Sequence, residues 1–246
     1  MVFALSIAGV HNPPGSRGGG VRAAVDWAAS LGFGALQLDA AAPGVRAREL
    51  GRSARRDLAA TLRRRGLALT GLDLWIPPEH YTSPETGDRA AGALLAAIDL
   101  AAELGPLAGS RGVVVSVTLP EDPGGGLLDA IAARADAGGV LVEDFTSEPP
   151  GGVIRPGFDT SRHLLRGEKP GRAFARSASA LATLRLNDAD DTGRRALGRG
   201  LLDIEMMRAL HATLTPTIPV ITDLRGRIDP ATGADDARRA WGVREV

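Results

Sequence analysis

The chain has 246 residues, with 29 Lys and Arg side chains against 29 Asp and Glu, so no net charge draws it toward nucleic acid or an acidic membrane. It contains no cysteine, which excludes disulfides, thiolate metal sites, iron–sulfur clusters and a cysteine nucleophile. Hydrophobic residues make up 44% and charged residues 24%, ordinary values for a globular protein with a buried core. These values are compatible with a cytoplasmic protein, and we expect no nucleic-acid or membrane partner.

Short β-like runs alternate with helical patterns along the chain. The expected strands are residues 3–9, 35–38, 67–74, 113–117, 140–142, 155–158, 182–186 and 218–222. The expected helices are residues 21–31, 54–65, 85–104, 126–137, 172–179, 203–214 and 232–241. This βα repeat has no linker-like break, so it predicts a single domain over residues 1–246 with an α/β fold, a (β/α)8 TIM barrel.

The segment after the fifth expected strand departs from this rhythm. Residues 146–152 (TSEPPGG) are too few and too rich in proline and glycine to hold a helix, so we expect a short or missing helix there.

A Rossmann fold is the competing interpretation, because a strand, a glycine-rich stretch and a helix precede Asp39. The spacing argues against it. No G-x-G-x-x-G occurs, and about ten residues separate the strand from the helix where a tight turn is required.

In a parallel barrel, the carboxyl ends of all strands meet at one mouth, where active sites form. The residues at or just past the expected strand ends are His11, Asp39, Asp73, Glu121, Glu143, Asp159, Asp188 and Asp223. An aspartate after a strand is often only the N-cap of the next helix. The prediction of a site therefore depends on these groups converging, not on any one of them.

Four segments resemble the xylose isomerase-like barrels, the superfamily of sugar phosphate isomerases/epimerases and endonuclease IV. They are residues 24–38 (AVDWAASLGFGALQL), 67–74, 85–105 (which ends in LAAELG) and 182–188. The resemblance implies a TIM barrel with a divalent metal, Mn²⁺ or Mg²⁺. The family's ligands are a Glu ending strand five, an Asp and a His around strand six, a His at strand seven and a Glu ending strand eight.

Carried over by position, the resemblance implies a degenerate metal site. Glu143 and Asp159 match in type, His163 stands four residues after Asp159 where three are usual, and Asp223 replaces the last Glu. Arg185 stands where the strand-seven His is expected. The metal-ligand candidates are thus Glu143, Asp159, His163 and Asp223, beside a fixed positive charge that would repel a cation.

The resemblance also implies roles for side chains around the mouth. Glu143 and Asp223 match the two flanking carboxylates that move a proton at carbon in these enzymes. Arg185 would stabilise an enediolate or bind an anionic substrate, or would simply pair with Asp159 or Asp223; both interpretations stay open. The other substrate-binding candidates are Asp188, Trp75, His11 and Arg225. The arginine- and glycine-rich residues 190–203 lie where barrels often bind phosphate.

The predicted function is that of a sugar or sugar-phosphate isomerase or epimerase working by enediol proton transfer. The alternatives are a catalytically degenerate barrel that binds a small polyol or anion, and a lyase or hydrolase on the same scaffold. No P-loop is present, and Lys169, the single lysine, falls in a loop, so no nucleotide or pyridoxal phosphate cofactor is expected. The expected partner is a small-molecule substrate, with a homo-oligomer as a further expectation.

Overall fold

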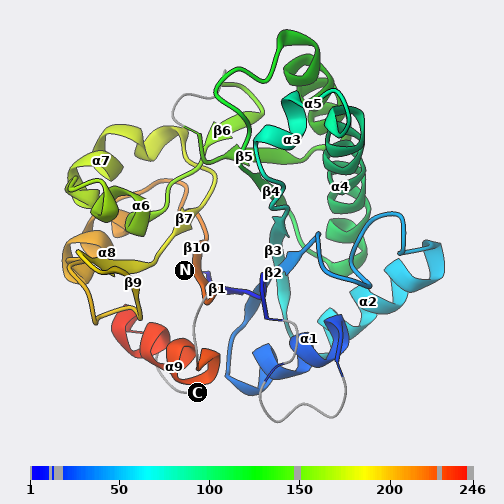
Figure 1. Ribbon diagram of the computed structural model, residues 1–246. Coiled ribbons are helices and arrows are strands. Elements are labelled where there is room, and N and C mark those ends of the chain that lie inside the picture. Colours follow the sequence, from blue (N-terminus) through cyan, green and yellow to red (C-terminus); the bar gives the residue numbers. More distant parts are fainter. Residues whose placement is uncertain (1, 11–12, 14–18, 147–150, 226–228, 243–246) are drawn as a thin grey trace.

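The computed structural model describes residues 2–10, 13, 19–146, 151–225 and 229–242. Eight parallel strands form its centre (Figure 1). They are β1 (Phe3–Ser6), β2 (Ala35–Asp39), β3 (Ala68–Asp73), β4 (Val114–Val117), β5 (Leu141–Asp144), β6 (Ile154–Pro156), β7 (Leu184–Arg185) and β10 (Val220–Asp223).

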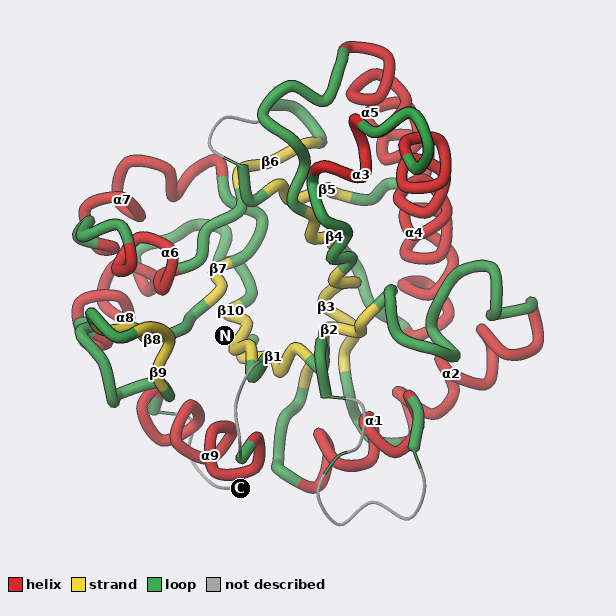
Figure 2. The backbone as a smooth tube through the Cα atoms, viewed as in Figure 1, coloured by secondary structure: helices red, strands yellow, loops and turns green. Residues whose placement is uncertain are grey.

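The strands pair in the order β6-β5-β4-β3-β2-β1-β10-β7. The two ends of this order meet through an isolated parallel bridge between Asp159 and Arg185, where the Arg185 N–H donates to the Phe158 carbonyl at 2.9 Å. The strands therefore curl around a common axis, as Figure 2 shows. The predicted (β/α)8 barrel is confirmed.

Helices surround the strands on the outside (Figure 1). The longer ones are α1 (Val21–Ser30), α2 (Arg52–Arg64), α4 (Gly87–Ala108), α5 (Gly125–Gly138), α7 (Pro170–Ser177), α8 (Ile204–Ala212) and α9 (Pro230–Trp241). None of the described residues between β5 and β6 is helical, as the proline- and glycine-rich sequence predicts.

The structure adds short elements that the sequence analysis did not anticipate. They are α3 (Glu79–Thr82), α6 (Thr160–Leu165), the 3₁₀ turn Ala178–Ala180 and the antiparallel hairpin of β8 (Asp188–Asp190) and β9 (Gly193–Arg195). Each spans too few residues to show a hydrophobic period, which is why the pattern did not reveal them.

Helix α4 is long and apolar enough to cross a membrane by length and composition alone. In the barrel it packs against α2 and α5, and Leu94, Ile98 and Leu104 are fully buried along it. Its apolar character is thus accounted for by packing within the fold.

Side chains along the strands alternate between the outer helices and the barrel interior. Ala4, Ala35 and Ile221 form a small apolar cluster apart from the main core. Nearer their carboxyl ends, the strands of the barrel also carry buried polar residues. These residues are Ser6, Gln37, Asp73, Ser116, Glu143, Arg185 and Asp223. The apolar cluster lies nearer the amino ends of the strands than this polar layer. The polar layer therefore lies at the carboxyl ends, where the site is.

Candidate active site

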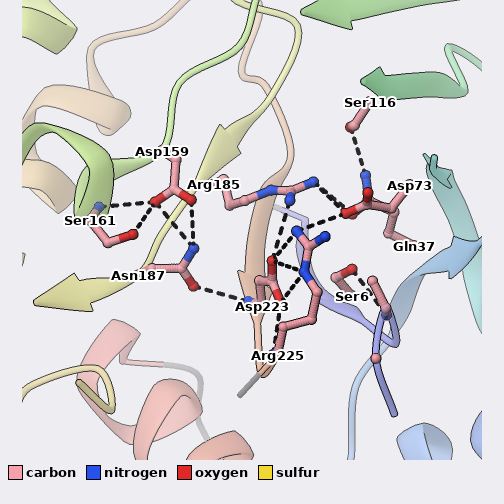
Figure 3. Close-up of polar contacts among 12 residues, drawn as sticks. Ser6, Gln37, Asp73, Ser116, Asp159, Ser161, Arg185, Asn187, Asp223 and Arg225 are labelled. Carbon is pink, nitrogen blue, oxygen red and sulfur yellow. Dashed lines mark hydrogen bonds and ion pairs between the residues drawn. The ribbon is translucent and has the colours of Figure 1, made fainter. Parts of the chain in front are cut away.

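Arg185 lies in the middle of the polar layer, only 4% exposed (Figure 3). Its Nη2 lies 2.9 Å from Asp73 Oδ2 and its Nη1 lies 3.3 Å from Asp223 Oδ2. Nη2 also donates to Gln37 Oε1 at 3.2 Å, and the guanidinium carbon lies 4.7 Å from the Phe145 ring centre. Burial opposes the charge of Arg185, but Asp73 and Asp223 outweigh it and raise the pKa of Arg185. The guanidinium is a fixed cation.

Asp223 is surrounded by guanidinium groups. Three guanidinium nitrogens lie near Asp223 Oδ2. Arg225 Nη2 is 2.5 Å away, Arg185 Nη1 is 3.3 Å away and Arg194 Nη2 is 4.0 Å away. Burial would raise the pKa of Asp223, but Arg185 and Arg225 hold it down at about 2. Asp223 is therefore a permanent anion whose charge is already compensated.

Glu143, on β5, is a fully buried member of the same polar layer. The Thr183 hydroxyl donates to its carboxylate at 2.7 Å, and the Ser116 hydroxyl donates to Oε2 at 3.1 Å. Burial raises the pKa of Glu143 to about 7, against the opposing effects of the Thr183 hydrogen bond, the Arg185 charge and the Ser116 hydrogen bond. Glu143 therefore exchanges its proton close to neutral pH.

Gln37 and Ser116 connect Glu143 with Arg185. The Gln37 amide oxygen accepts from Arg185, and its Nε2 donates to Ser116 Oγ at 2.9 Å. Ser116 in turn donates to Glu143. Gly71 allows this packing, because a Cβ there would lie 2.4 Å from the Val114 carbonyl oxygen. A continuous hydrogen-bonded chain thus runs from the carboxyl group to the guanidinium.

A cavity of about 800 Å³ opens at the mouth beside the polar layer. Ser116 and Phe145 line it, and Trp75 and Leu165, 59% and 51% exposed, stand at its rim. Its lining also carries many charged side chains. Among the described residues these are Asp39, Asp73, Asp159, Arg46, Arg162, Arg185, Arg194 and Arg225. The volume suits a small metabolite, and the lining suits a polar one.

Asp159 occupies the wall between β6 and β7. Its Oδ1 accepts from the backbone N–H and the hydroxyl of Ser161, at 2.9 and 2.7 Å, and the Asn187 amide donates at 3.2 Å (Figure 3). Arg194 Nη2 lies 3.4 Å from Oδ2. Asp159 therefore caps α6 and anchors the wall, as strand-end aspartates often do.

The structure brings several predicted site residues together. Arg185, Trp75, Arg225 and Asp159 line the cavity, whereas Glu143 and Asp223 are buried next to it and do not face it.

Other predicted residues lie elsewhere. Asp188 is fully buried and accepts the backbone N–H groups of Ala189, Gly198, Gly200 and Leu202, so it organises the loop after β8. His163 stacks on Phe158 at 4.4 Å, and its Nδ1 lies 2.6 Å from a Glu168 carboxylate oxygen. Glu121 is exposed, and His11 lies outside the described residues.

Gln37, Ser116 and Arg162 are site residues that were not predicted from the sequence. Gln37 and Ser116 are single polar residues inside otherwise apolar strands, ALQLD and VVSV. Arg162 lies on the unanticipated helix α6 and lines the cavity. A polar residue on the inward face of a buried strand was the available signal for the first two.

A divalent metal does not fit the donors that this mouth offers. Within the described parts of the chain, no three His, Asp or Glu side chains converge as a metal-binding group. Oxygen atoms of Asp73 and Asp223 point instead at the Arg185 guanidinium. A cation placed among them would meet that fixed positive charge at short range.

Comparison with solved structures identifies the fold. A xylose isomerase domain protein from Planctomyces limnophilus is 17% identical, with a TM-score of 0.69 over 98% of this chain and 94% of that one. A xylose isomerase-like TIM barrel protein from Mycobacterium smegmatis, in complex with magnesium, is 16% identical, with a TM-score of 0.68 over 98% and 96%. A D-psicose 3-epimerase in the presence of D-fructose is 13% identical, with a TM-score of 0.72 over 98% and 97%.

The chain has the xylose isomerase-like TIM barrel fold. No protein-family model and no curated protein matches the sequence. At these identities the likeness establishes the architecture and not the reaction, because one fold hosts many chemistries.

Proposed function

We propose that this xylose isomerase-like barrel is an isomerase or epimerase of a small hydroxylated carbonyl compound, a sugar or sugar phosphate, acting by enediol proton transfer. The observation that carries the proposal is the buried Arg185 guanidinium at the cavity, joined through Gln37 and Ser116 to Glu143. Several structural neighbours are epimerases or isomerases by name, which supports the same general kind of reaction.

In this proposal Arg185 provides the positive charge that stabilises the enediolate. Enediolate formation places negative charge on oxygen, and a preorganised cation in a water-poor site lowers the barrier to it. Asp73 and Asp223 hold the guanidinium in place, so it does not have to reorganise during the reaction. Its Nε is buried and has no hydrogen-bond partner among the described residues.

Glu143 is the proton acceptor and works through Ser116, because Ser116 lines the cavity and Glu143 does not. The substrate C–H proton passes to Ser116 Oγ as the Ser116 hydroxyl proton passes to Glu143. The C–H electron pair forms the C=C bond, and the C=O π electron pair moves onto the oxygen beside Arg185. Return of a proton to the same carbon from the other face gives the epimer. Return to the former carbonyl carbon, while the proton of the neighbouring hydroxyl passes to the former carbonyl oxygen, gives the isomer. A pKa of about 7 suits Glu143 to this exchange.

A binding barrel without catalysis is the second candidate. The burial of both predicted acid/base carboxylates favours it, since neither Glu143 nor Asp223 faces the cavity. In that function the same arginines would hold a polyol or an anion and no proton would move.

Exchange of carbon-bound substrate protons in deuterated water distinguishes an isomerase or epimerase from a binding barrel. We expect a panel of aldoses, ketoses and their phosphates, incubated with protein and a chelator, to include a compound that gains deuterium beside its carbonyl, measured by NMR. Ser116→Ala, Glu143→Gln and Arg185→Met should each slow this exchange about 10²-fold or more. Ser116→Thr, which keeps the hydroxyl, and the exposed Arg166→Gln should retain it. Ligand binding that Arg185→Met abolishes, with no exchange in any compound, would establish the binding barrel.

A further inference from the structure

The arginines around the cavity are not equally compensated. Arg185 and Arg225 at the floor share Asp73 and Asp223, at distances from 2.5 to 3.3 Å. These four side chains form a neutral group. Arg185 can still face the oxygen of a carbonyl group, but the group as a whole offers no net charge, so the charge for a further anionic group of a ligand must come from the other arginines of the cavity.

Arg162 on α6 is a half-buried guanidinium whose single hydrogen bond within the described structure goes to the Phe145 carbonyl oxygen. No described carboxylate lies within ion-pair distance of it. Burial and the neighbouring Arg166 charge lower the pKa of Arg162, and the charges of Asp159 and Asp144 oppose them only in part. A charge taken partly out of water without an ion-pair partner is costly, and a bound anion would relieve that cost.

Arg194 on β9 is the second such group. Among the described residues, its Nη2 makes only long contacts, 3.4 Å to Asp159 and 4.0 Å to Asp223, and the side chain is 32% exposed. Asp159 already accepts from Ser161 and Asn187, so it is shared among several donors. Within the part of the chain that the structure describes, most donors of Arg194 therefore have no partner.

Arg162 and Arg194 lie on the same wall of the cavity. Helix α6 packs against β8, which pairs with β9, and both side chains line the cavity beside Asp159. Two guanidiniums with unused N–H donors provide two positive charges and two planar sets of donors. This combination matches a phosphate dianion better than it matches a singly charged carboxylate.

We propose that Arg162 and Arg194 bind the phosphate of a phosphorylated substrate whose carbonyl end reaches Arg185 and Ser116. The proposal rests on the proposed function, because it names the substrate class of the same site. It selects sugar phosphates over free sugars.

Calorimetric titration with inorganic phosphate, D-fructose 6-phosphate, D-fructose and D-gluconate tests this assignment without requiring turnover. We expect both phosphate compounds to bind and D-fructose to bind at least about 10-fold more weakly than its phosphate. Arg162→Gln and Arg194→Gln should each weaken phosphate binding about 10-fold or more. Arg166→Gln on α6 and Arg195→Gln on β9, neither of which lines the cavity, are the matched controls and should bind as the wild type does.

Arg162→Lys keeps the charge and should retain part of the affinity if Arg162→Gln proves unstable in a thermal melt. Equal binding of D-fructose and its phosphate, or phosphate binding unaffected by both Gln variants, would overturn the assignment. Tight gluconate binding with the same arginine dependence and no phosphate binding would also overturn it, in favour of a carboxylate. Arginine-dependent phosphate binding without deuterium exchange in any compound would instead refute only the isomerase proposal.

Discussion

Arg185 and Asp223 form a buried ion pair in which Nη1 and Oδ2 are 3.3 Å apart and both side chains are at most 5% exposed. The pair joins β7 to β10, which are neighbours in the barrel. Because Asp223 is also paired with Arg225, and Arg185 with Asp73, the loss of any member leaves a buried charge uncompensated. The stability of the fold and the charge of the site therefore depend on the same side chains.

Asp223→Asn should lower the free energy of unfolding by about 3–5 kcal/mol at pH 7, the usual cost of breaking a buried pair. The folded pKa of Asp223, about 2, lies below its ordinary value of 3.8, so its stabilisation is present above the unfolded pKa and is lost as pH falls through 2. Urea unfolding from pH 7 down to pH 2 measures this. A variant as stable as the wild type at pH 7 would contradict the ion-pair assignment.

The raised pKa of Glu143 should make the free energy of unfolding depend on pH in the opposite direction. Its folded pKa of about 7 lies above its ordinary value of 4.5, so the folded chain binds the extra proton and stability falls as pH rises from 4.5 through 7. Above pH 7, ionisation of the buried Glu143 should lower the free energy of unfolding by about 3 kcal/mol relative to low pH. Glu143→Gln should remove this dependence, so unfolding curves at pH 5 and pH 8 should differ less in the variant than in the wild type. Identical pH profiles in both proteins would show that Glu143 is ionised throughout.

Asp188 and Gly200 should matter for folding. A Cβ at position 200 would lie 2.3 Å from Asp188 Oδ1 and 2.6 Å from the Ala189 carbonyl oxygen, so Gly200→Ala forces apart the loop that Asp188 organises. Asp188→Ala leaves several backbone N–H groups without their acceptor, at about 1–3 kcal/mol for each one that stays buried. Both variants should melt well below the wild type. Gly126→Ala, where no atom of the described residues lies within 4 Å of the added carbon, is the control.

The sequence predicted the barrel because each long element carries its own period, and eight repeats leave little choice of topology. The resemblance to the xylose isomerase-like barrels pointed to Arg185, because Arg185 stands where the family's strand-seven His is expected. The short hairpin and α6 escaped prediction, because three to six residues show no period.

The candidate site was less accessible to sequence reasoning. Strand ends indicate the mouth, but not which carboxylates face the cavity and which lie buried beneath it. Glu143 and Asp223 belong to the second group, and only the packing of Ser116, Phe145 and Arg185 reveals this. The residue three positions after Asp159 is Arg162, which lines the cavity, whereas His163 stacks on Phe158.

The last prediction concerns metal binding. Mn²⁺ titrated into the wild-type protein should show no tight stoichiometric binding, because the Arg185 charge lies among the carboxylates that a cation needs. Two unit charges 4 Å apart repel by roughly 4 kcal/mol at an effective dielectric constant of 20, and a divalent ion doubles this. Arg185→His removes the fixed charge and supplies a neutral imidazole, so it should bind Mn²⁺ at least about 10-fold more tightly than the wild type.

Arg185→Met controls for loss of the charge without a new ligand and should fall between the wild type and Arg185→His. Electron paramagnetic resonance of free Mn²⁺ measures all three proteins under the same conditions. Tight binding by the wild type, at one ion per chain, would mean that Asp73, Asp159 and Asp223 rearrange around a cation and that Arg185 moves out of the mouth. In that event Arg185→Met should also retain isomerase activity in the presence of the metal, whereas the proposed role of Arg185 requires that activity to be lost with or without it.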